Sequence, residues 1–562
     1  MKTSSLIKKS SVSVVLSLTA ATALHAAVTP VALPQLYQWR CVADTCTVAL
    51  GPCAAPAPLT RFVNFNPPVM PQYDAPLVAF KAWITPTTLT TGLVVNASND
   101  EGVWSTGPAW TAGALMGPTH NILREGDSVP ASGNTFGFAN ALNVQNLQMA
   151  AGGVTMCMTD TSAPAGKVAV LENCCLQNLG ESPSSTYVDI LPPVIDMANR
   201  NIGMWKRAVG GVSGVEHGAL PGFIMPPCTP PVNAWWSGFS PMWAPNQLAR
   251  VGSPSISEQG TIALYGRDNF IPATQRNHLR VVDPAGVPTV VVRQGWACPP
   301  VPGLLPPGSR FGIIHTRLQA NSDDRTIASA PTDLVAWQMD SMIAAGPVTV
   351  NQDTLWCKQS GVFNCLAYQS QNAPFIPGRT IAGFYALHAI AQQGVTNSSH
   401  VVWGVRLSPG VGQVAIYTSL VTGGVMGPID LIATDVPGIT PVNTLTAGMQ
   451  NITTLAPFFS VNARGDVLFK ATCAGAPVGQ RQILVTASAA AGHARSVRAQ
   501  SGLPLPTLNC GMAVASNFQL ATPEQGTYSR GQALNGLKNA AAKIFFNAPA
   551  PVGSGQGVFI GF

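Results

Sequence analysis

The residues best suited to covalent chemistry in this 562-residue chain are its 12 cysteines. A structural metal site needs closely paired ligands, and the sequence contains no C-x-x-C pair. An even number of cysteines instead favours disulfides in an exported chain. Cys357 and Cys365 are separated by seven residues, which suits a bridge across a hairpin or loop. We therefore predict a Cys357–Cys365 disulfide, oxidation of most other cysteines and no bound metal.

A run of aromatic residues offers non-covalent chemistry instead. Trp235, Trp236, Phe239 and Trp243 lie within nine consecutive residues. Exposed rings of this kind stack on sugars, peptides and other apolar surfaces. The alternative is that these rings cap an open face or fill the core of a small extra sheet. We predict that these four residues form the contact surface for a partner, which is either an extracellular protein or a glycan.

Groups for acid–base or nucleophilic catalysis are scattered along the chain. No nucleophile elbow, H-E-x-x-H, phosphate-binding loop, EF-hand loop or dinucleotide fingerprint occurs. Glu216 and His217 follow Ser213, but this order fits no known elbow and is more simply a solvent-exposed loop. We therefore predict no catalytic residue and no cofactor. The expected function is that of an exported, non-enzymatic protein with a binding or structural role. The alternative is an enzyme acting on carbohydrate, a glycosidase or lyase built on the same fold.

The first 27 residues read as a secretory signal peptide. Lys2, Lys8 and Lys9 precede a mostly apolar stretch, and Ala26 or Ala27 provides a small-residue cleavage point. We divide the chain into a signal peptide at 1–27 and one domain at 28–562, located in the periplasm, on the cell surface or outside the cell. No run of about 18 apolar residues follows residue 27, so the sequence predicts no membrane-spanning helix. The residues after 27 carry a net charge of about +3, too weak to predict nucleic-acid binding.

The composition indicates an all-β fold. Hydrophobic residues make up 46% of the chain, which is too many for a disordered protein, although charged residues make up only 10%. The 54 glycines and 48 prolines are spread between short apolar runs, as turns are spread between strands. Long amphipathic helical stretches are nearly absent.

The elements that would position any site belong to a degenerate repeat. Asn462–Ala471 (NARGDVLFKA) is the clearest copy of an N-x-x-G-x-x-A-F-x-A pattern, which describes a turn feeding a strand. Successive copies begin 70, 114, 64, 76, 65 and 77 residues apart. The starts are Tyr73, Asn143, Ser257, Asn321, Asn397, Asn462 and Asn539. Five of the six intervals fall between 64 and 77 residues, and this near-constant spacing predicts a repeat architecture of about seven units.

Arginine also recurs at one place in several units, at Arg124, Arg293 and Arg498. The simpler interpretation is a hydrogen bond from each guanidinium to a backbone carbonyl of the neighbouring unit. The alternative is a ring of basic groups around a central channel.

The first unit resembles a known family. The segments that carry the likeness are Asn99–Trp104, Leu123–Asp127, Phe136–Phe138 and Asn143. Together they resemble one full unit of the bacterial choice-of-anchor tandem-repeat NxxGxxAF-containing proteins, which are exported. The likeness extends over most of residues 60–546, although Asp324, His400 and Ala542 replace the glycine of the motif. It implies an exported repeat protein and brings no catalytic residues.

We expect a single closed β-propeller of about seven blades, because a blade of four short strands cannot bury both faces alone. The alternative is an array of sandwiches or a solenoid. The last blade is expected to be shared between the N- and C-terminal segments. Residues 36–48 and 61–65 would complete the strands that follow Asn539. The long second interval predicts an insertion near residues 160–250.

Overall fold

In the computed structural model, the residues described are 34–45, 60–70, 77–86, 100–106, 119–125, 145–149, 155–161, 201–207, 251–256, 262–267, 277–282, 288–301, 305–314, 327–330, 334–345, 348–489, 492–508, 510–521, 533–550 and 552–562. All regular elements within them are β-strands, so the predicted all-β class is confirmed for this part of the chain. No helix in these ranges is long and apolar enough to cross a membrane. The predicted signal peptide, residues 1–27, lies outside the described residues.

The strands form seven antiparallel sheets, which we number I to VII in chain order. Sheet I contains β2 (Thr60–Phe65), β3 (Ala79–Pro86), β4 (Glu101–Thr106) and β5 (Thr119–Arg124). Sheet II contains β6 (Gln145–Met149), β7 (Thr155–Thr161) and β8 (Asn201–Arg207). Sheet III contains β9 (Val251–Ile256), β10 (Ile262–Arg267), β11 (Asn277–Val282) and β12 (Pro288–Arg293).

The remaining four sheets contain five strands each. Sheet IV contains β13 (Arg310–Ile314), β14 (Ile327–Ala330), β15 (Leu334–Ala345), β16 (Val348–Gln359) and β17 (Val362–Tyr368). Sheet V contains β18 (Thr380–Ala391), β19 (Ser398–Ser408), β20 (Val414–Thr422), β21 (Val425–Met426) and β22 (Asp430–Thr434). Sheet VI contains β23 (Pro441–Thr444), β24 (Gly448–Val461), β25 (Val467–Cys473), β26 (Gln482–Ala487) and β27 (Arg495–Gln500). Sheet VII contains β1 (Trp39–Asp44), β28 (Pro504–Pro506), β29 (Met512–Gln519), β30 (Ala540–Asn547) and β31 (Ser554–Gly561).

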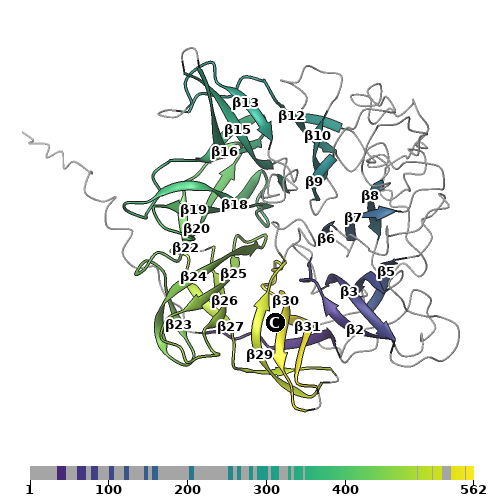
Figure 1. Cartoon of the computed structure of the whole chain (residues 1–562). Helices are drawn as coiled ribbons and strands as arrows, with labels where there is room; N and C mark the ends of the chain where they lie inside the picture. The colour runs from purple at the N-terminus through teal and green to yellow at the C-terminus, as the bar shows by residue number, and fades with distance from the viewer. Residues whose placement is uncertain are drawn as a thin grey trace, which may run out of the picture.

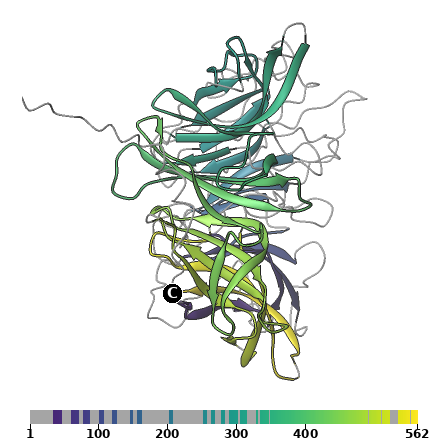
Figure 2. The ribbon, with the colours of Figure 1, turned by 90° about the vertical axis from the view of Figure 1, so that its left-hand side faces the viewer.

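Each sheet packs against the next one in chain order, and sheet VII packs against sheet I through β31 and β2. Figure 1 shows the yellow strands of sheet VII beside the purple strands of sheet I. Figure 2, turned by 90°, brings the green strands of sheets V and VI toward the viewer. The number of sheets in the described residues therefore agrees with the predicted seven units. Strand β8 lies inside the predicted insertion near 160–250 and pairs with β7 in sheet II.

Sheet VII is shared between the two ends of the chain, as predicted. Strand β1 pairs antiparallel with β31, with Trp39 opposite Gly561 and Asp44 opposite Gly557. The N-terminal segment also contacts sheet VI, because the backbone N–H groups of Gln35 and Tyr37 donate to the carbonyls of Val497 and Arg498. One segment therefore bridges sheets VI and VII.

The predicted contribution of residues 61–65 to this shared sheet is wrong. These residues belong to β2, which pairs with β3 in sheet I. Strands β28 and β29, which come before the turn that leads into β30, already belong to sheet VII. The N-terminal segment therefore adds only one strand to this sheet, β1. The repeat motif predicts that a unit begins at this turn, whereas the turn lies between β29 and β30 of one sheet.

Alternating burial explains why these short segments form strands. In β29, Ala513 and Ala515 are buried while Met512, Val514 and Ser516 are exposed, the period-two pattern of a sheet with one covered face. The covered faces of sheets I and VII contribute to one hydrophobic cluster, in which the rings of Phe62 and Trp104 meet edge to face at 5.1 Å.

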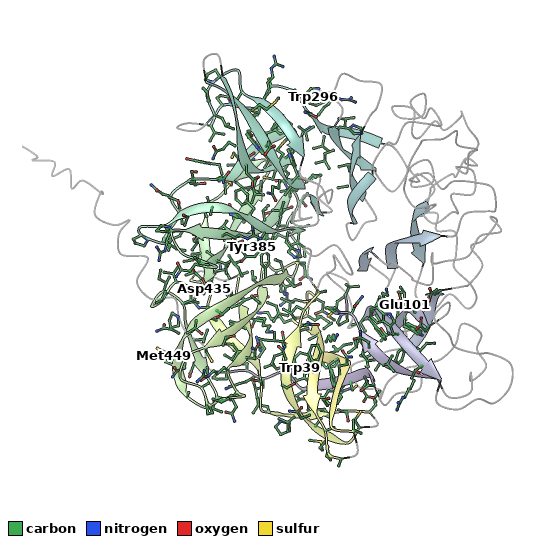
Figure 3. The ribbon with its side chains drawn as sticks, in the orientation of Figure 1. Trp39, Glu101, Trp296, Tyr385, Asp435 and Met449 are labelled. Atoms are coloured by element: carbon green, nitrogen blue, oxygen red, sulfur yellow. The ribbon has the colours of Figure 1, made fainter. Side chains whose placement is uncertain are left out.

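Buried polar side chains cross from sheet to sheet. Asp435, labelled in Figure 3 below Tyr385, accepts hydrogen bonds from the N–H of Val414 in sheet V at 2.8 Å and of Leu455 in sheet VI at 3.4 Å. Burial raises the pKa of this carboxyl. Arg495 of β27 donates to the carbonyl of Ile432 in sheet V at 2.9 Å. Such contacts fix neighbouring sheets relative to one another.

Candidate ligand-binding cleft

The asparagine of the repeat motif organises a turn, as its sequence predicts. Oδ1 of Asn462 accepts hydrogen bonds from the backbone N–H groups of Arg464 at 3.0 Å and Asp466 at 2.9 Å. Gly465 adopts φ +81°, and a Cβ built there would lie 2.5 Å from the ring of His400, so only glycine fits. The motif residues therefore act in turn formation and close packing.

The equivalent turn in sheet VII begins at Asn535, four residues before the position assigned from sequence. Oδ1 of Asn535 accepts from the N–H groups of Leu537 and Asn539, and Lys538 takes the left-handed position with φ +67°. Ala542, taken from sequence as the replacement for the motif glycine, lies instead inside β30. The error arose because a lysine, not a glycine, occupies the left-handed position.

The turn in sheet V is displaced in the same way. Asn397 has φ +54° and is the left-handed residue of that turn, not its first residue. His400, taken as the glycine replacement, lies in β19, and burial lowers its pKa to about 4. Asp324 lies outside the described residues.

The motif turns also join neighbouring sheets. Nδ2 of Asn462 in sheet VI donates to the carbonyl oxygen of Asn535 in sheet VII at 3.1 Å, and Lys538 pairs with Asp466 at 3.3 Å. Arg498 of β27 donates to the carbonyl of Gln35, before β1, at 3.2 Å. The predicted guanidinium–carbonyl contact between units is thus confirmed for Arg498.

The predicted Cys357–Cys365 disulfide is wrong, because both thiols are free. Cys357 lies opposite Asn364, and Cys365 lies opposite Trp356. Successive side chains of a strand point to opposite faces, so the two sulfurs lie on different sides of sheet IV and pack in different hydrophobic clusters. Spacing along the chain could not reveal this register.

Three other described cysteines are also free, so the expected oxidation of most cysteines fails for five of them: Cys41, Cys298, Cys357, Cys365 and Cys473. Cys510 is disulfide-bonded, to a partner that is not among the described side chains. The predicted contact residues Trp235, Trp236, Phe239 and Trp243 lie outside the described residues. Within the described ranges, no group of three or more His, Cys, Asp or Glu side chains could hold a metal ion.

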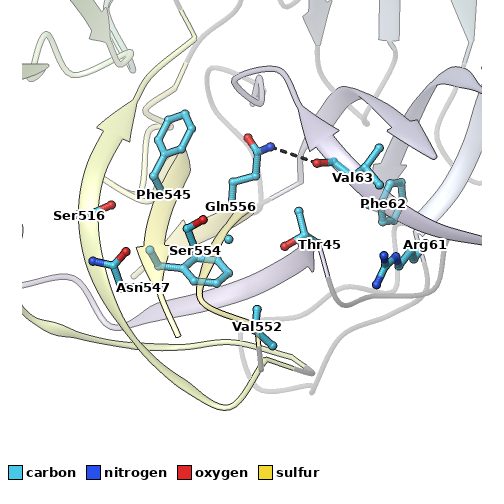
Figure 4. A pocket seen from close by; sticks show the side chains of 12 residues that line it. Thr45, Arg61, Phe62, Val63, Ser516, Phe545, Asn547, Val552, Ser554 and Gln556 are labelled. Carbon is cyan, nitrogen blue, oxygen red and sulfur yellow. Dashed lines mark hydrogen bonds between the residues drawn. The ribbon is translucent and has the colours of Figure 1, made fainter. Parts of the chain in front are cut away.

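A cleft of about 690 Å³ opens between sheets VII and I, where the two ends of the chain meet. Figure 4 shows side chains of β29, β30 and β31 on one side and those of β2 on the other. A hydrogen bond from Nε2 of Gln556 to the carbonyl oxygen of Val63, at 3.1 Å, links the two walls. A volume between roughly 300 and 1,000 Å³ is typical of small-molecule sites.

Strand register builds the wall from sheet VII. Phe545 lies directly opposite Gln556, and Asn547 lies directly opposite Ser554. Residues two apart in a strand share a face, so a ring, two amides and a hydroxyl form one surface. Ser516 adds a second hydroxyl at a β-bulge of the adjacent strand.

The cleft is electropositive. The exposed guanidinium of Arg61 lies on the wall from sheet I. Lys543 lies two residues before Phe545 in β30; its Nζ is 4.7 Å from the centroid of the Phe545 ring and donates to Oδ1 of Asn64 at 3.3 Å. Burial lowers the pKa of Lys543 to about 8, which still leaves it mostly protonated at neutral pH.

One acceptor in the cleft is unused. Oε1 of Gln556 is buried and has no hydrogen-bond partner among the described residues. Leaving such an oxygen without a donor costs about 1–3 kcal/mol.

A separate group of carboxylates lies in sheet I. Glu101 forms an ion pair with Lys81 at 2.6 Å and accepts a hydrogen bond from Nε1 of Trp83. The pKa of Glu125 is raised to about 7, first by burial and then by the negative charges of Glu101 and Asp100. Glu125 is only 3% exposed.

Comparison with known proteins yields structural likenesses only. No protein-family model matches the chain, and no curated protein does. A Dyadobacter fermentans protein of unknown function is similar with a TM-score of 0.29 and 9% identity, over 93% of this chain and 98% of that one. A hypothetical selenium-binding protein from Sulfolobus tokodaii gives 0.30 and 8%, over 83% and 88%. An α-L-arabinofuranosidase from Fusarium graminearum gives 0.23 and 7%, over 55% and 92%. These values are too low to transfer a function.

Sequence analysis missed every residue of the cleft. Phe545, Asn547, Ser554 and Gln556 come together only through the β30–β31 register, and Arg61 joins them only because the last sheet lies beside the first. Residues 545–556 (FFNAPAPVGSGQ) show no alternation of polar and apolar residues, so no local pattern marks them as one surface.

Proposed function

We propose that the seven sheets are the blades of a single closed β-propeller. The same contact supports this at two junctions. Lys470 of sheet VI donates to Oδ1 of Asn517 in sheet VII at 2.6 Å, and Lys543 of sheet VII donates to Asn64 in sheet I. Both asparagine oxygens also accept the N–H of the following phenylalanine, next to a β-bulge. The junction between the chain ends is thus built like the junction within the chain. A crystal structure with an open array, or with sheets I and VII apart, would overturn this proposal.

We further propose that the protein is exported and works as a non-enzymatic binding protein, with its ligand, a glycan or an extracellular protein, in the cleft between the first and last blades. The observation that carries this is the composition of the cleft. Its described lining offers an aromatic ring, amides, hydroxyls and one guanidinium, which are groups that orient a ligand.

The test is a binding screen of the protein lacking residues 1–27 against glycan and extracellular-protein arrays. Phe545→Ala and Gln556→Ala should weaken the bound signal, since they remove the ring and the bridging amide. Met449→Ala is the matched control, because Met449 is an exposed side chain on β24 of another sheet. A signal that survives both cleft substitutions would place the ligand elsewhere.

The carboxylates of sheet I favour a second candidate function, an enzyme acting on carbohydrate such as a glycosidase or lyase. A carboxyl with a raised pKa beside an ion-paired carboxylate is the pattern of a general acid and its partner. Against this, a general acid must reach its substrate, and Glu125 is buried. Polysaccharide cleavage that is lost in both Glu125→Gln and Glu101→Gln would establish this candidate over the first.

A further inference from the structure

The cleft recognises one chemical class better than others. Its lining combines a cation at Arg61, an aromatic ring at Phe545 and the amide of Gln556. We infer that the cleft binds an acidic oligosaccharide, with a carboxylate-bearing sugar residue at Arg61. This inference rests on the proposed binding function and names its ligand class.

The guanidinium selects the charge of the ligand. Arg61 is exposed and lies on the wall opposite Phe545, and an arginine binds a carboxylate through two parallel N–H···O bonds. Lys543 adds a second positive charge beside the Phe545 ring, although it is buried and does not line the cleft itself. The described lining residues include no Asp or Glu that would repel an anion.

The other wall fits a sugar ring. A pyranose has one apolar C–H face, which packs on an aromatic ring, and hydroxyls around its edge. Phe545 and Gln556 lie opposite each other on neighbouring strands, so a sugar over the ring lies beside the Gln556 side chain. Asn547 and Ser554 form the next pair along the same face and offer a donor and acceptors to a second sugar.

An extended peptide fits this surface less well. On the wall from sheet VII there is no free strand edge, because β31 is paired on both sides, by β30 and β1. On the wall from sheet I, β2 is the edge strand among the described strands, and a peptide that adds a strand would have to pair there. Binding of such a peptide in place of either sugar tetramer described below would overturn the inference.

The experiment uses one oligosaccharide in two charge states. Titration calorimetry of the protein lacking residues 1–27 would compare a tetramer of α-1,4-linked galacturonate with its fully methyl-esterified form. The ester keeps the rings and hydroxyls and removes the negative charge. We expect the acid to bind roughly tenfold or more tightly than the ester, because charge-assisted hydrogen bonds to arginine are lost in the ester.

Variants then assign the selectivity to the cleft. Arg61→Gln should reduce the affinity for the acid to that for the ester and leave the ester unaffected, while Phe545→Ala should weaken both. Arg406→Gln, at an exposed arginine on β19 of sheet V, is the matched control and should change neither. Raising the salt concentration from about 0.05 to about 0.5 M should weaken the binding of the acid and leave the binding of the ester unchanged.

Equal affinities of wild-type protein for acid and ester, or an acid preference that persists in Arg61→Gln, would overturn the inference while the proposed binding function stands. Binding of neither tetramer would also overturn it. The proposed function itself fails only if no ligand of the array screen depends on Phe545 and Gln556.

Discussion

Single buried charges set how the stability of this protein depends on pH. The pKa of Glu125 is raised from 4.5 to about 7, so between these values the folded protein holds a proton that the unfolded chain has released. Its contribution to the free energy of unfolding is complete below pH 4.5 and is lost as the pH rises through 7. We expect the free energy of unfolding of the wild-type protein to fall by about 1–3 kcal/mol over this pH range, and Glu125→Gln should remove most of that fall. Urea unfolding at pH 4.5, 6 and 7.5 measures it, and parallel curves for both proteins would contradict the assignment.

Lys543 has the opposite effect at alkaline pH. Burial lowers its pKa from 10.5 to about 8, so between these values the unfolded chain binds more protons and the folded state gains stability as the pH rises. The gain is at most about 3 kcal/mol. Lys543→Met should be more stable than wild type at pH 7 and should lose the rise from pH 8 to 10.5. Lys358→Met is the control, since Lys358 lies over Phe363 at 4.9 Å in the same manner. A rise that persists in Lys543→Met would refute this role.

The free thiols are a further residue-scale test. Burial raises the pKa of Cys298 to about 11 and those of Cys357 and Cys365 to about 12, so these thiols should not react with a thiol reagent at pH 8 in the native protein. In unreduced protein unfolded by guanidinium, at least five thiols should react. Fewer than five would show that some of them are oxidised in the protein as it is isolated.

At the scale of the elements, the asparagine turns connect strands within a sheet and also connect sheets. Asn462→Ala removes the acceptor of two backbone N–H groups and the donor to Asn535. We expect a loss of roughly 2–4 kcal/mol in the free energy of unfolding, because buried groups lose their partners. Asn451→Ala, at an exposed position of β24, is the control and should cost under 1 kcal/mol. Equal losses in the two variants would mean that the turn is held by its backbone alone.

Elements were easier to predict than sites, for physical reasons. Local turn chemistry and burial alternation are written in adjacent residues, so the all-β class, the turn at Asn462 and the shared last sheet could be foreseen. Register depends on pairing between distant strands, so the faces of Cys357 and Cys365 could not. The cleft depends on both register and the packing of the last sheet on the first. Its residues, Arg61 and Gln556 among them, carry no local sign of their proximity.

At the scale of the whole molecule, the N-terminal segment holds two sheets. Removing residues 28–45 would leave one edge of β31 unpaired and take away Tyr37, whose hydroxyl donates to the carbonyl of Lys538 at 2.9 Å. We expect unfolding at lower denaturant and a loss of several kcal/mol, because an apolar face and a strand edge become exposed. Removing only residues 28–33 is the control. A protein lacking 28–45 that melts like the full-length chain would show that the junction does not need this strand.

The pairing of β1 with β31 also orders the events of biogenesis. Trp39 is made about 520 residues before its partner Gly561. At about 5–20 residues per second, β1 waits roughly half a minute to two minutes for β31. During that interval an unpaired strand edge is open to chaperones, to proteases and to the β31 of another copy. Strand β1 therefore leaves the ribosome long before the strand that pairs with it.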